Sequence, residues 1–124
     1  MDYRETLSKV DHTILDVSAT WKDIKQYCDE AIEYETASVC IPPSYVKQAK
    51  EYLKERKKIC TVIGFPNGYN TTVVKIQETI DAISNGADEI DMVANIGMLK
   101  DKRYDSLMSE IASIKEICKD KILK

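Results

Sequence analysis

Two carboxylates, Glu89 and Asp91, stand two positions apart in a segment whose other residues are mostly apolar. Their neighbours Ile90 and Met92 are typical of a strand that is buried in a core. Because side chains alternate between the two faces of a strand, Glu89 and Asp91 point to the same side. A carboxylate in such a setting can act as a general acid or base. A structural explanation is also open, in which Asp91 accepts hydrogen bonds from a neighbouring strand or loop and Glu89 pairs with a lysine.

The same alternation divides each predicted strand into a polar face and a mainly apolar face. The polar set consists of Asp11, Thr13, Ser38, Cys40, Thr61, Glu89, Asp91 and Asn95. The other set consists of His12, Ile14, Val39, Ile41, Cys60, Val62, Ile90 and Met92. This second set suits contact with covering helices. If the strands are parallel, several of the polar side chains meet near the carboxyl ends of the strands, where the active sites of α/β proteins lie.

Thiol, metal and nucleotide chemistry have less support in the sequence. Cys40 lies in the polar set, but no histidine accompanies it there to activate a thiol, so we expect a small wall residue. His12 points to the other face and is expected to be structural. The four cysteines form no CxxC pair, which favours reduced, buried thiols over a metal site or a disulfide framework. Thr13 and Thr61 could each simply satisfy backbone groups. No glycine pattern matches a dinucleotide-binding motif or a P-loop.

Strand and helix patterns alternate along the chain that must position these residues. Strands are predicted over 10–15, 37–41, 58–66 and 88–94, and residues 121–124 look like a fifth strand that has just begun. Helices are predicted within 18–34, 44–56, 71–85 and 104–118, after a short N-terminal helix. The result is a run of four β-α units.

Apolar spacing predicts which side of each helix is buried. The first long helix has Trp21, Ile24, Cys28 and Ala31 at helical spacing, the third has Val73, Ile76, Ile80 and Ile83, and the fourth has Tyr104, Leu107, Ile111, Ile114 and Cys118. Thr20 and Asp23 give a weak capping-box signal at the start of the first of these helices. Gly86, after Asn85, can take the positive φ that ends the third.

The near-continuous apolar strands favour a parallel sheet covered by helices, in an α/β fold. Two architectures fit this pattern: an open doubly wound sheet, and part of a (β/α) barrel. A whole barrel takes ~250 residues, so this chain of 124 residues would form about half of one. Because a fifth strand begins at 121–124, we predict a partial (β/α)8 TIM barrel, with the first four β-α units and the start of the fifth strand in a single domain over 1–124.

Composition limits the classes of partner. The net charge is -3 and the charges are interspersed, so no basic face is expected for nucleic acid or an anionic membrane. No apolar run approaches the roughly 20 residues that span a bilayer, and the N-terminus has no apolar signal core. We therefore expect a cytoplasmic protein.

Five segments in order resemble the N-terminal half of the bacterial-type deoxyribose-phosphate aldolase family. They are VDHTIL, TWKDIKQYCDEAIEY, ASVCIPPSYV, CTVIGFPNGYNTT and NGADEIDMVANIGMLK. The resemblance implies a (β/α) barrel class I aldolase of deoxyribonucleotide catabolism. Such an enzyme cleaves 2-deoxyribose 5-phosphate to glyceraldehyde 3-phosphate and acetaldehyde through a lysine Schiff base, without a metal or other cofactor.

The resemblance also implies roles for individual residues. Asp91 matches the aspartate that relays a proton as the carbon-carbon bond breaks or forms, and Asp11, Thr13 and Cys40 match positions that line the substrate pocket. The Schiff-base lysine of the family lies in a later strand, within a Lys-Thr-Ser-Thr-Gly type run that this sequence lacks. The lysines singled out in this chain, Lys58, Lys100, Lys121 and Lys124, do not match it.

We therefore expect this chain to be inactive as an aldolase by itself. The alternative is a non-catalytic half-barrel that forms a homo-oligomer or pairs with a complementary half, because exposed sheet edges favour association.

Three departures from the family pattern are Glu35 in place of glycine, Pro42 in place of asparagine, and Asp16-Val17 in place of Lys-Pro. Glu35 would be strained if the glycine it replaces needs a positive φ.

Overall fold

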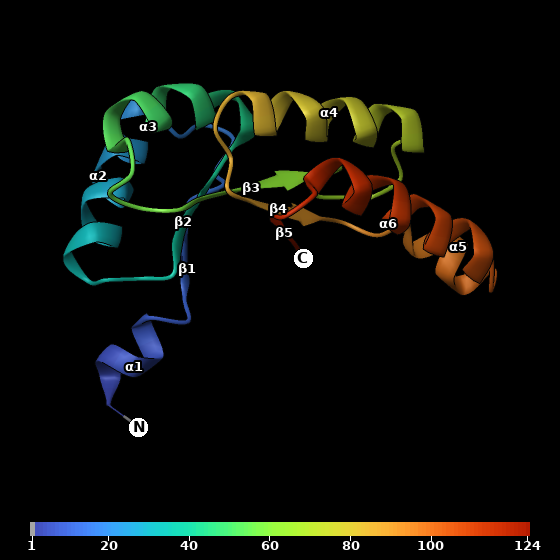
Figure 1. Ribbon diagram of the computed structural model, residues 1–124, viewed down its shortest axis with the longest axis horizontal. Helices are drawn as coiled ribbons and strands as arrows, with labels where there is room; N and C mark the ends of the chain where they lie inside the picture. The colour runs from blue at the N-terminus through green and yellow to red at the C-terminus, as the bar shows by residue number, and fades with distance from the viewer. Residues whose placement is uncertain (1) are drawn as a thin grey trace.

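Five parallel strands form one sheet in the computed structural model, which describes residues 2–124 (Figure 1). The strands are β1 (Asp11–Thr13), β2 (Ser38–Ile41), β3 (Ile59–Ile63), β4 (Glu89–Met92) and β5 (Ile122–Leu123). The α-helices are α1 (Tyr3–Leu7), α2 (Trp21–Glu33), α3 (Val46–Leu53), α4 (Thr72–Ser84), α5 (Ile96–Lys100) and α6 (Tyr104–Cys118), and η1 (Pro43–Tyr45) is a 3-10 turn. The four predicted β-α units and the start of a fifth strand are confirmed.

The strand order distinguishes the two predicted architectures. The strands lie side by side in the order of the sequence, β1-β2-β3-β4-β5, and every neighbouring pair is parallel. A doubly wound sheet reverses its strand order at a switch point, and this sheet has no reversal among the described residues. Helices α2, α3, α4 and α6 curve around one side of the strands, whereas α1 lies apart from them (Figure 1). The arrangement is that of a partial barrel.

The main core fills the space between the sheet and its helices. It contains Ile24, Cys28 and Ala31 of α2, together with apolar residues of the strands, and Trp21 packs against it. The predicted buried face of α2 is therefore confirmed. The Asp23 carboxylate accepts hydrogen bonds from the Thr20 N–H and hydroxyl, both at 2.8 Å, which fixes the start of α2. A second, smaller cluster of Cys40, Cys60 and Val62, with Leu15, lies apart from this core.

The predicted buried face of α4 is partly wrong. Val73 and Ile80 are 74% and 44% exposed, whereas Lys75, Thr79 and Ala82 are buried. Ile76 and Ile83 of the predicted stripe do pack against the core. Helix α4 packs on both β3 and α6, so its buried side covers only part of that stripe. Helix α6 shows the same effect. Its Tyr104 and Ile111 are exposed, and Glu110 is buried among Leu107, Ile114 and Cys118.

Two backbone expectations are confirmed at the ends of helices. Gly86 has a φ of 114° directly after α4, which only glycine adopts readily. Glu35 follows α2 with a φ of 52°, so a side chain stands where the left-handed conformation favours glycine. Across residues 2–124, no helix combines the length and the apolar character that crossing a membrane requires.

Candidate active site on the open sheet face

The register of the strands brings one set of side chains to the face opposite the main core, which we call the inner face. Asp11 is level with Ser38, and Thr13 is level with Cys40. Further across the sheet, Cys40 is level with Cys60, Cys60 with Glu89, and Val62 with Asp91. Six of the predicted polar residues therefore share one face: Asp11, Thr13, Ser38, Cys40, Glu89 and Asp91.

Thr61 does not belong to this face, so its predicted place in the polar set is wrong. It is level with Ile41 and Ile90, which face the helices, and its hydroxyl donates to the Ile41 carbonyl at 2.7 Å. Cys60 and Val62 take the inner positions of β3 instead. Strand β3 is buried on both faces, so polarity did not reveal which side faced inward. The expectation that Thr61 satisfies a backbone group is confirmed.

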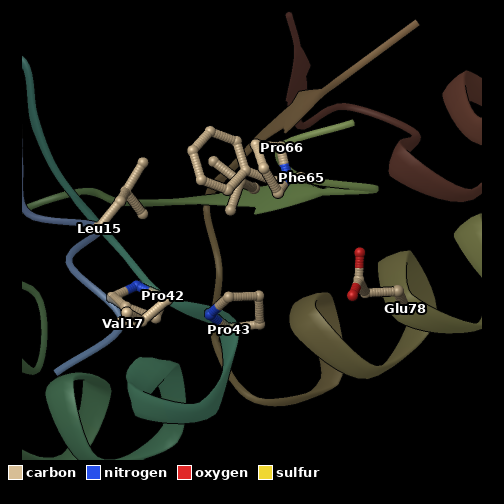
Figure 2. Close-up of a pocket in the computed structure, with 8 residues that line it drawn as sticks. Leu15, Val17, Pro42, Pro43, Phe65, Pro66 and Glu78 are labelled. Atoms are coloured by element: carbon tan, nitrogen blue, oxygen red, sulfur yellow. The ribbon is translucent and has the colours of Figure 1, made fainter. Parts of the chain in front are cut away.

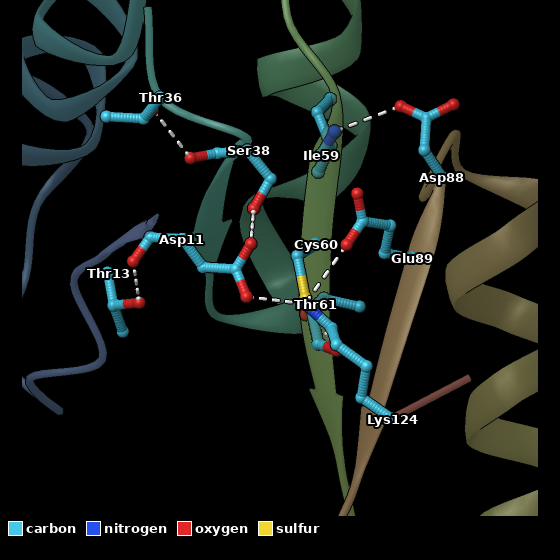
Figure 3. A network of polar contacts seen from close by, with 10 residues as sticks. All are labelled: Asp11, Thr13, Thr36, Ser38, Ile59, Cys60, Thr61, Asp88, Glu89 and Lys124. Atoms are coloured by element: carbon cyan, nitrogen blue, oxygen red, sulfur yellow. Dashed lines mark hydrogen bonds and ion pairs between the residues drawn. The ribbon is translucent and has the colours of Figure 1, made fainter. Parts of the chain in front are cut away.

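An ion-pair network occupies the inner face near the amino-terminal half of the strands (Figure 3). The Asp11 carboxylate accepts a hydrogen bond from the Ser38 hydroxyl at 2.6 Å through one oxygen and from the Lys124 ammonium at 2.5 Å through the other. Lys124 also pairs with Glu89 at 3.0 Å. The predicted ion pair of Glu89 with a lysine is thus present, and one ammonium bridges two carboxylates from strands β1 and β4.

This network shifts the proton affinity of its members. Burial raises the pKa of Asp11, but the hydrogen bonds from Lys124 and Ser38 outweigh it and hold the pKa below its ordinary value of 3.8. Burial lowers the pKa of Lys124, and the hydrogen bonds to Asp11 and Glu89 outweigh it and raise that pKa above its ordinary value of 10.5. Lys124 is therefore a protonated, fixed positive charge at neutral pH.

Asp11, Cys60 and Glu89 have the donor types of a metal site, with ligand atoms within 4.8 Å of one another. The Lys124 ammonium contacts both carboxylates, so it supplies the positive charge that a cation would otherwise bring. The hydrogen bond with Cys40 and burial raise the pKa of the Cys60 thiol. A thiol that holds its proton is a poor metal ligand, so this group of side chains is better suited to an ion pair than to a metal.

Asp91 lies on the same face, one step closer to the carboxyl ends of the strands, and is half-buried. The main chain of Lys124 bonds to both neighbours of Asp91: it donates to the Ile90 carbonyl at 2.7 Å and accepts from the Met92 N–H at 2.8 Å. Across the sheet, the hydrogen bond with Cys60 lowers the pKa of the Cys40 thiol, and burial and the charge of Asp91 oppose this shift. Asp91 therefore sits between β3 and β5 with neighbours on both sides, at the level where substrates meet a parallel sheet.

A cavity of about 280 Å³ opens beyond the carboxyl ends of β1, β2 and β3 (Figure 2). Its lining residues are Leu15, Val17, Pro42, Pro43, Val62, Phe65, Pro66 and Glu78. Val62 also belongs to the inner face, where it is level with Asp91, so the cavity and the inner face share this one side chain. The cavity is mostly apolar and has one carboxylate at its edge, as small-molecule sites often do.

Residues 4–124 match the model of the DeoC/LacD family aldolases. The chain belongs to this family. It is 60% identical over 121 residues to a deoxyribose-phosphate aldolase of Clostridioides difficile, an alignment that covers 98% of this chain and 55% of that protein. It is 54% identical over 124 residues to a deoxyribose-phosphate aldolase of Streptococcus pyogenes, covering 100% of this chain and 56% of the relative.

Solved structures of aldolases share the fold. A structure assigned to a deoxyribose-phosphate aldolase of Coccidioides immitis superposes with a TM-score of 0.94 at 39% identity, over 99% of this chain and 49% of that one. A tetrameric deoxyribose phosphate aldolase of Aeropyrum pernix superposes with a TM-score of 0.74 at 22% identity, over 98% of this chain and 64% of that one. The chain spans about half the length of the curated relatives it matches.

The remaining residues of the predicted polar set have structural contacts. The Thr13 hydroxyl is exposed and donates to the Asp11 carbonyl at 2.8 Å, which confirms the backbone role left open for it. The Asn95 side chain accepts from the Met98 N–H at 3.0 Å and caps helix α5. His12 lies on the opposite face, 2.7 Å from Glu30, and its ring stacks on Tyr27, so its structural interpretation is confirmed.

The sequence identifies Lys124 only as a lysine that does not match the Schiff-base lysine of the family, and does not predict its place at the centre of the inner-face network. The spacing of the last four residues could have indicated the face on which Lys124 lies. Ile122 is level with Glu89, so alternation puts Lys124 on the same face as Glu89 and Asp91. All four cysteines are free and buried, which confirms the prediction from their spacing.

Proposed function

We propose that this chain supplies the acid/base half of a deoxyribose-phosphate aldolase active site, with Asp91 as the proton-transfer group. The substrate would be 2-deoxyribose 5-phosphate, a phosphosugar, and neither nucleic acid nor a membrane would be a partner. The proposal includes a cytoplasmic location and a role in deoxyribonucleotide catabolism. The observation that carries it is the placement of Asp91 on the inner face, level with Val62 of the cavity wall, in a chain of the DeoC/LacD aldolase family.

The chemistry needs an amine and a base. A lysine amine attacks the C1 carbonyl of the sugar and loses water to form an imine, which withdraws electrons from the C2-C3 bond. A carboxylate such as Asp91 accepts the proton of the C3 hydroxyl as the C2-C3 bond breaks, which gives an aldehyde and an enamine. Protonation and hydrolysis of the enamine then release acetaldehyde. Asp11, Thr13 and Cys40 would line the pocket, with Lys124 as a fixed charge beneath it.

Two lysines of the described chain, Lys124 on the inner face and the buried Lys75, are poor imine formers. A nucleophilic amine needs a lowered pKa, whereas the pKa of Lys124 is raised by its two carboxylates. Lys75 is fully buried and pairs with Glu110 at 2.7 Å, so no substrate carbonyl can reach it. We therefore infer that the imine lysine belongs to the second half of the barrel.

The experiment compares the 124-residue chain with a chimera in which it replaces the matching segment of the Clostridioides difficile relative. We expect cleavage of 2-deoxyribose 5-phosphate by the chimera and none by the chain alone. Asp91→Asn in the chimera should lower kcat by about 10²–10⁴-fold, the usual worth of a general acid or base. Turnover by the chain alone, or full activity of the Asp91→Asn chimera, would overturn the proposal.

A second candidate function is a non-catalytic half-barrel that pairs with another copy or with a complementary half. It is favoured by the two edge strands, β1 and β5, which each have a strand on one side only among the described residues. Exposed parallel edges tend to associate. Light scattering of the purified chain decides the matter, because a stable monomer at micromolar concentration would count against pairing.

A further inference from the structure

Lys75 lies at a position that is unfavourable for a lysine in two respects. Its side chain is fully buried, which is costly for a charge unless it is paired. It also lies in the first turn of α4, where the positive end of the helix dipole disfavours a cation. A residue that violates local preferences in this way usually serves a specific purpose.

The contacts of Lys75 join three elements. Its ammonium donates to the Glu110 carboxylate of α6 at 2.7 Å and to the main-chain carbonyl of Val93, just after β4, at 2.9 Å. The second oxygen of Glu110 accepts from the Thr72 hydroxyl at 2.6 Å. Hydrogen bonds that involve a charged group are about twice as strong as neutral ones, so the Val93 carbonyl is firmly held.

The stem of Lys75 passes under the end of β3. A Cβ atom on Gly64 would lie 2.8 Å from Lys75 Cε, so the glycine leaves room for the lysine. One turn later on the same helix, the Glu78 carboxylate accepts the Gly64 N–H at 2.7 Å. Figure 2 shows Glu78 pointing from α4 toward the segment that follows β3. Helix α4 therefore binds the segments that follow β3 and β4, which we call the exits of these strands, through the charged side chains of Glu78 and Lys75.

The exit of β4 is the segment that continues from Asp91. Val93 is two residues further along, and its N–H donates to the Ile63 carbonyl at 3.0 Å while its carbonyl accepts from Lys75. On the other side, a Cβ atom on Gly68 would lie 2.2 Å from the Ala94 carbonyl oxygen, so the two exits touch. The backbone beyond Asp91 is thus fixed from α4 and from the β3 loop.

We propose that Lys75, held by Glu110, is a positioning residue that fixes the exit of β4 and thereby the direction of the Asp91 carboxylate. The inference rests on the proposed function for Asp91, which it deepens. Catalytic groups must be held within about 0.5 Å of their working position. A displacement of about 1 Å can cost 100-fold in rate, even when its origin is remote from the reacting atoms.

The double variant Lys75→Met/Glu110→Leu separates positioning from stability. Replacing a buried ion pair by apolar residues of similar volume often leaves stability unchanged or higher, whereas it removes the hydrogen bond to Val93. In the 124-residue chain, we expect amide hydrogen exchange at Val93 to become at least about 10-fold faster, with exchange at Val39 in β2 unchanged. In the chimera, we expect kcat to fall at least about 10-fold with KM within about twofold.

The matched control is Lys9→Met/Glu5→Gln, which removes an exposed lysine–glutamate pair at 3.7 Å at the carboxyl end of α1, the helix that lies apart from the sheet. It should leave Val93 exchange and kcat unchanged. Unaltered Val93 exchange in the Lys75→Met/Glu110→Leu chain would overturn the positioning role, as would an unaltered kcat in the chimera. A wild-type chimera without turnover would overturn the proposed function, and the exchange measurement would still decide whether Lys75 fixes the β4 exit.

Discussion

Two lysine–carboxylate sites of this chain use the same chemistry in different surroundings. Lys124 lies on the open inner face, where its side chain and that of Asp11 are about one third exposed, at 32% and 33%. Lys75 and Glu110 lie between α4 and α6, at 0% and 3%. The inner pair remains in reach of water and of a substrate, whereas the buried pair can act only through the backbone it holds. The difference in burial therefore gives the two ammonium groups different roles. That of Lys124 is accessible from the inner face, whereas that of Lys75 acts on the backbone around it.

The largest effect should come from breaking the buried pair on one side only. Lys75→Met leaves the Glu110 carboxylate buried without its cation, which costs about 3–5 kcal/mol. Urea unfolding of the chain measures this loss. A loss below about 1 kcal/mol would show that the pair is hydrated and that the contrast with the inner face is wrong.

The same substitution on the inner face should cost less. Lys124→Met removes the ammonium from Asp11 and Glu89, but water can reach the carboxylates, so we expect a loss of about 1 kcal/mol in the same unfolding measurement. The two carboxylates would then repel each other, which sets the sign as destabilising. A loss equal to that of Lys75→Met would remove the distinction between the two sites.

The inner pair should also give a pH signature. The pKa of Asp11 lies below its ordinary value of 3.8 in the folded chain, so ionised Asp11 stabilises the fold above that pH, and this contribution is lost as the pH falls below it. The difference in unfolding free energy between the wild type and Asp11→Asn should be about 0.5–1 kcal/mol near neutral pH, discounted for solvent screening. It should shrink toward zero as the pH falls below 3.8. A difference that grows on acidification would contradict the ion pair.

A smaller effect is expected at a backbone position remote from both pairs. Glu35 has a φ of 52°, where a side chain costs roughly 1 kcal/mol relative to glycine. Glu35→Gly should raise the unfolding free energy by about 0.5 kcal/mol, because the freer unfolded chain offsets part of the gain. Thermal unfolding checks the sign, and a lower midpoint would show that the residue is unstrained.

The sequence predicted the inner face where each strand has one polar side. Alternation placed Asp11, Cys40 and Asp91 together correctly, because β1, β2 and β4 carry polar side chains on that face. It failed at Thr61, because a strand buried on both faces gives polarity no fixed side. The strain at Glu35 was foreseen through the family pattern rather than from periodicity.

The structural roles of the two lysines could not be predicted from the sequence, for different physical reasons. Lys124 ends a strand of which the chain provides only Ile122 and Leu123, too short to display alternation by itself. Lys75 was hidden because helical periodicity looks for apolar residues, and the buried side of α4 carries a lysine and Thr79 instead. Its partner Glu110 comes from a helix 35 residues away in sequence, a pairing that no local pattern indicates.

The most direct test of the account asks which half of the barrel forms the imine. The chimera is incubated with 2-deoxyribose 5-phosphate and borohydride, and the reduced adduct is located by peptide mass spectrometry. We expect an adduct on a lysine of the segment supplied by the Clostridioides difficile relative and none on residues 1–124. The same adduct should form when Asp91→Asn has removed most of the turnover. An adduct on Lys124, Lys75 or any other lysine of this chain would contradict the account.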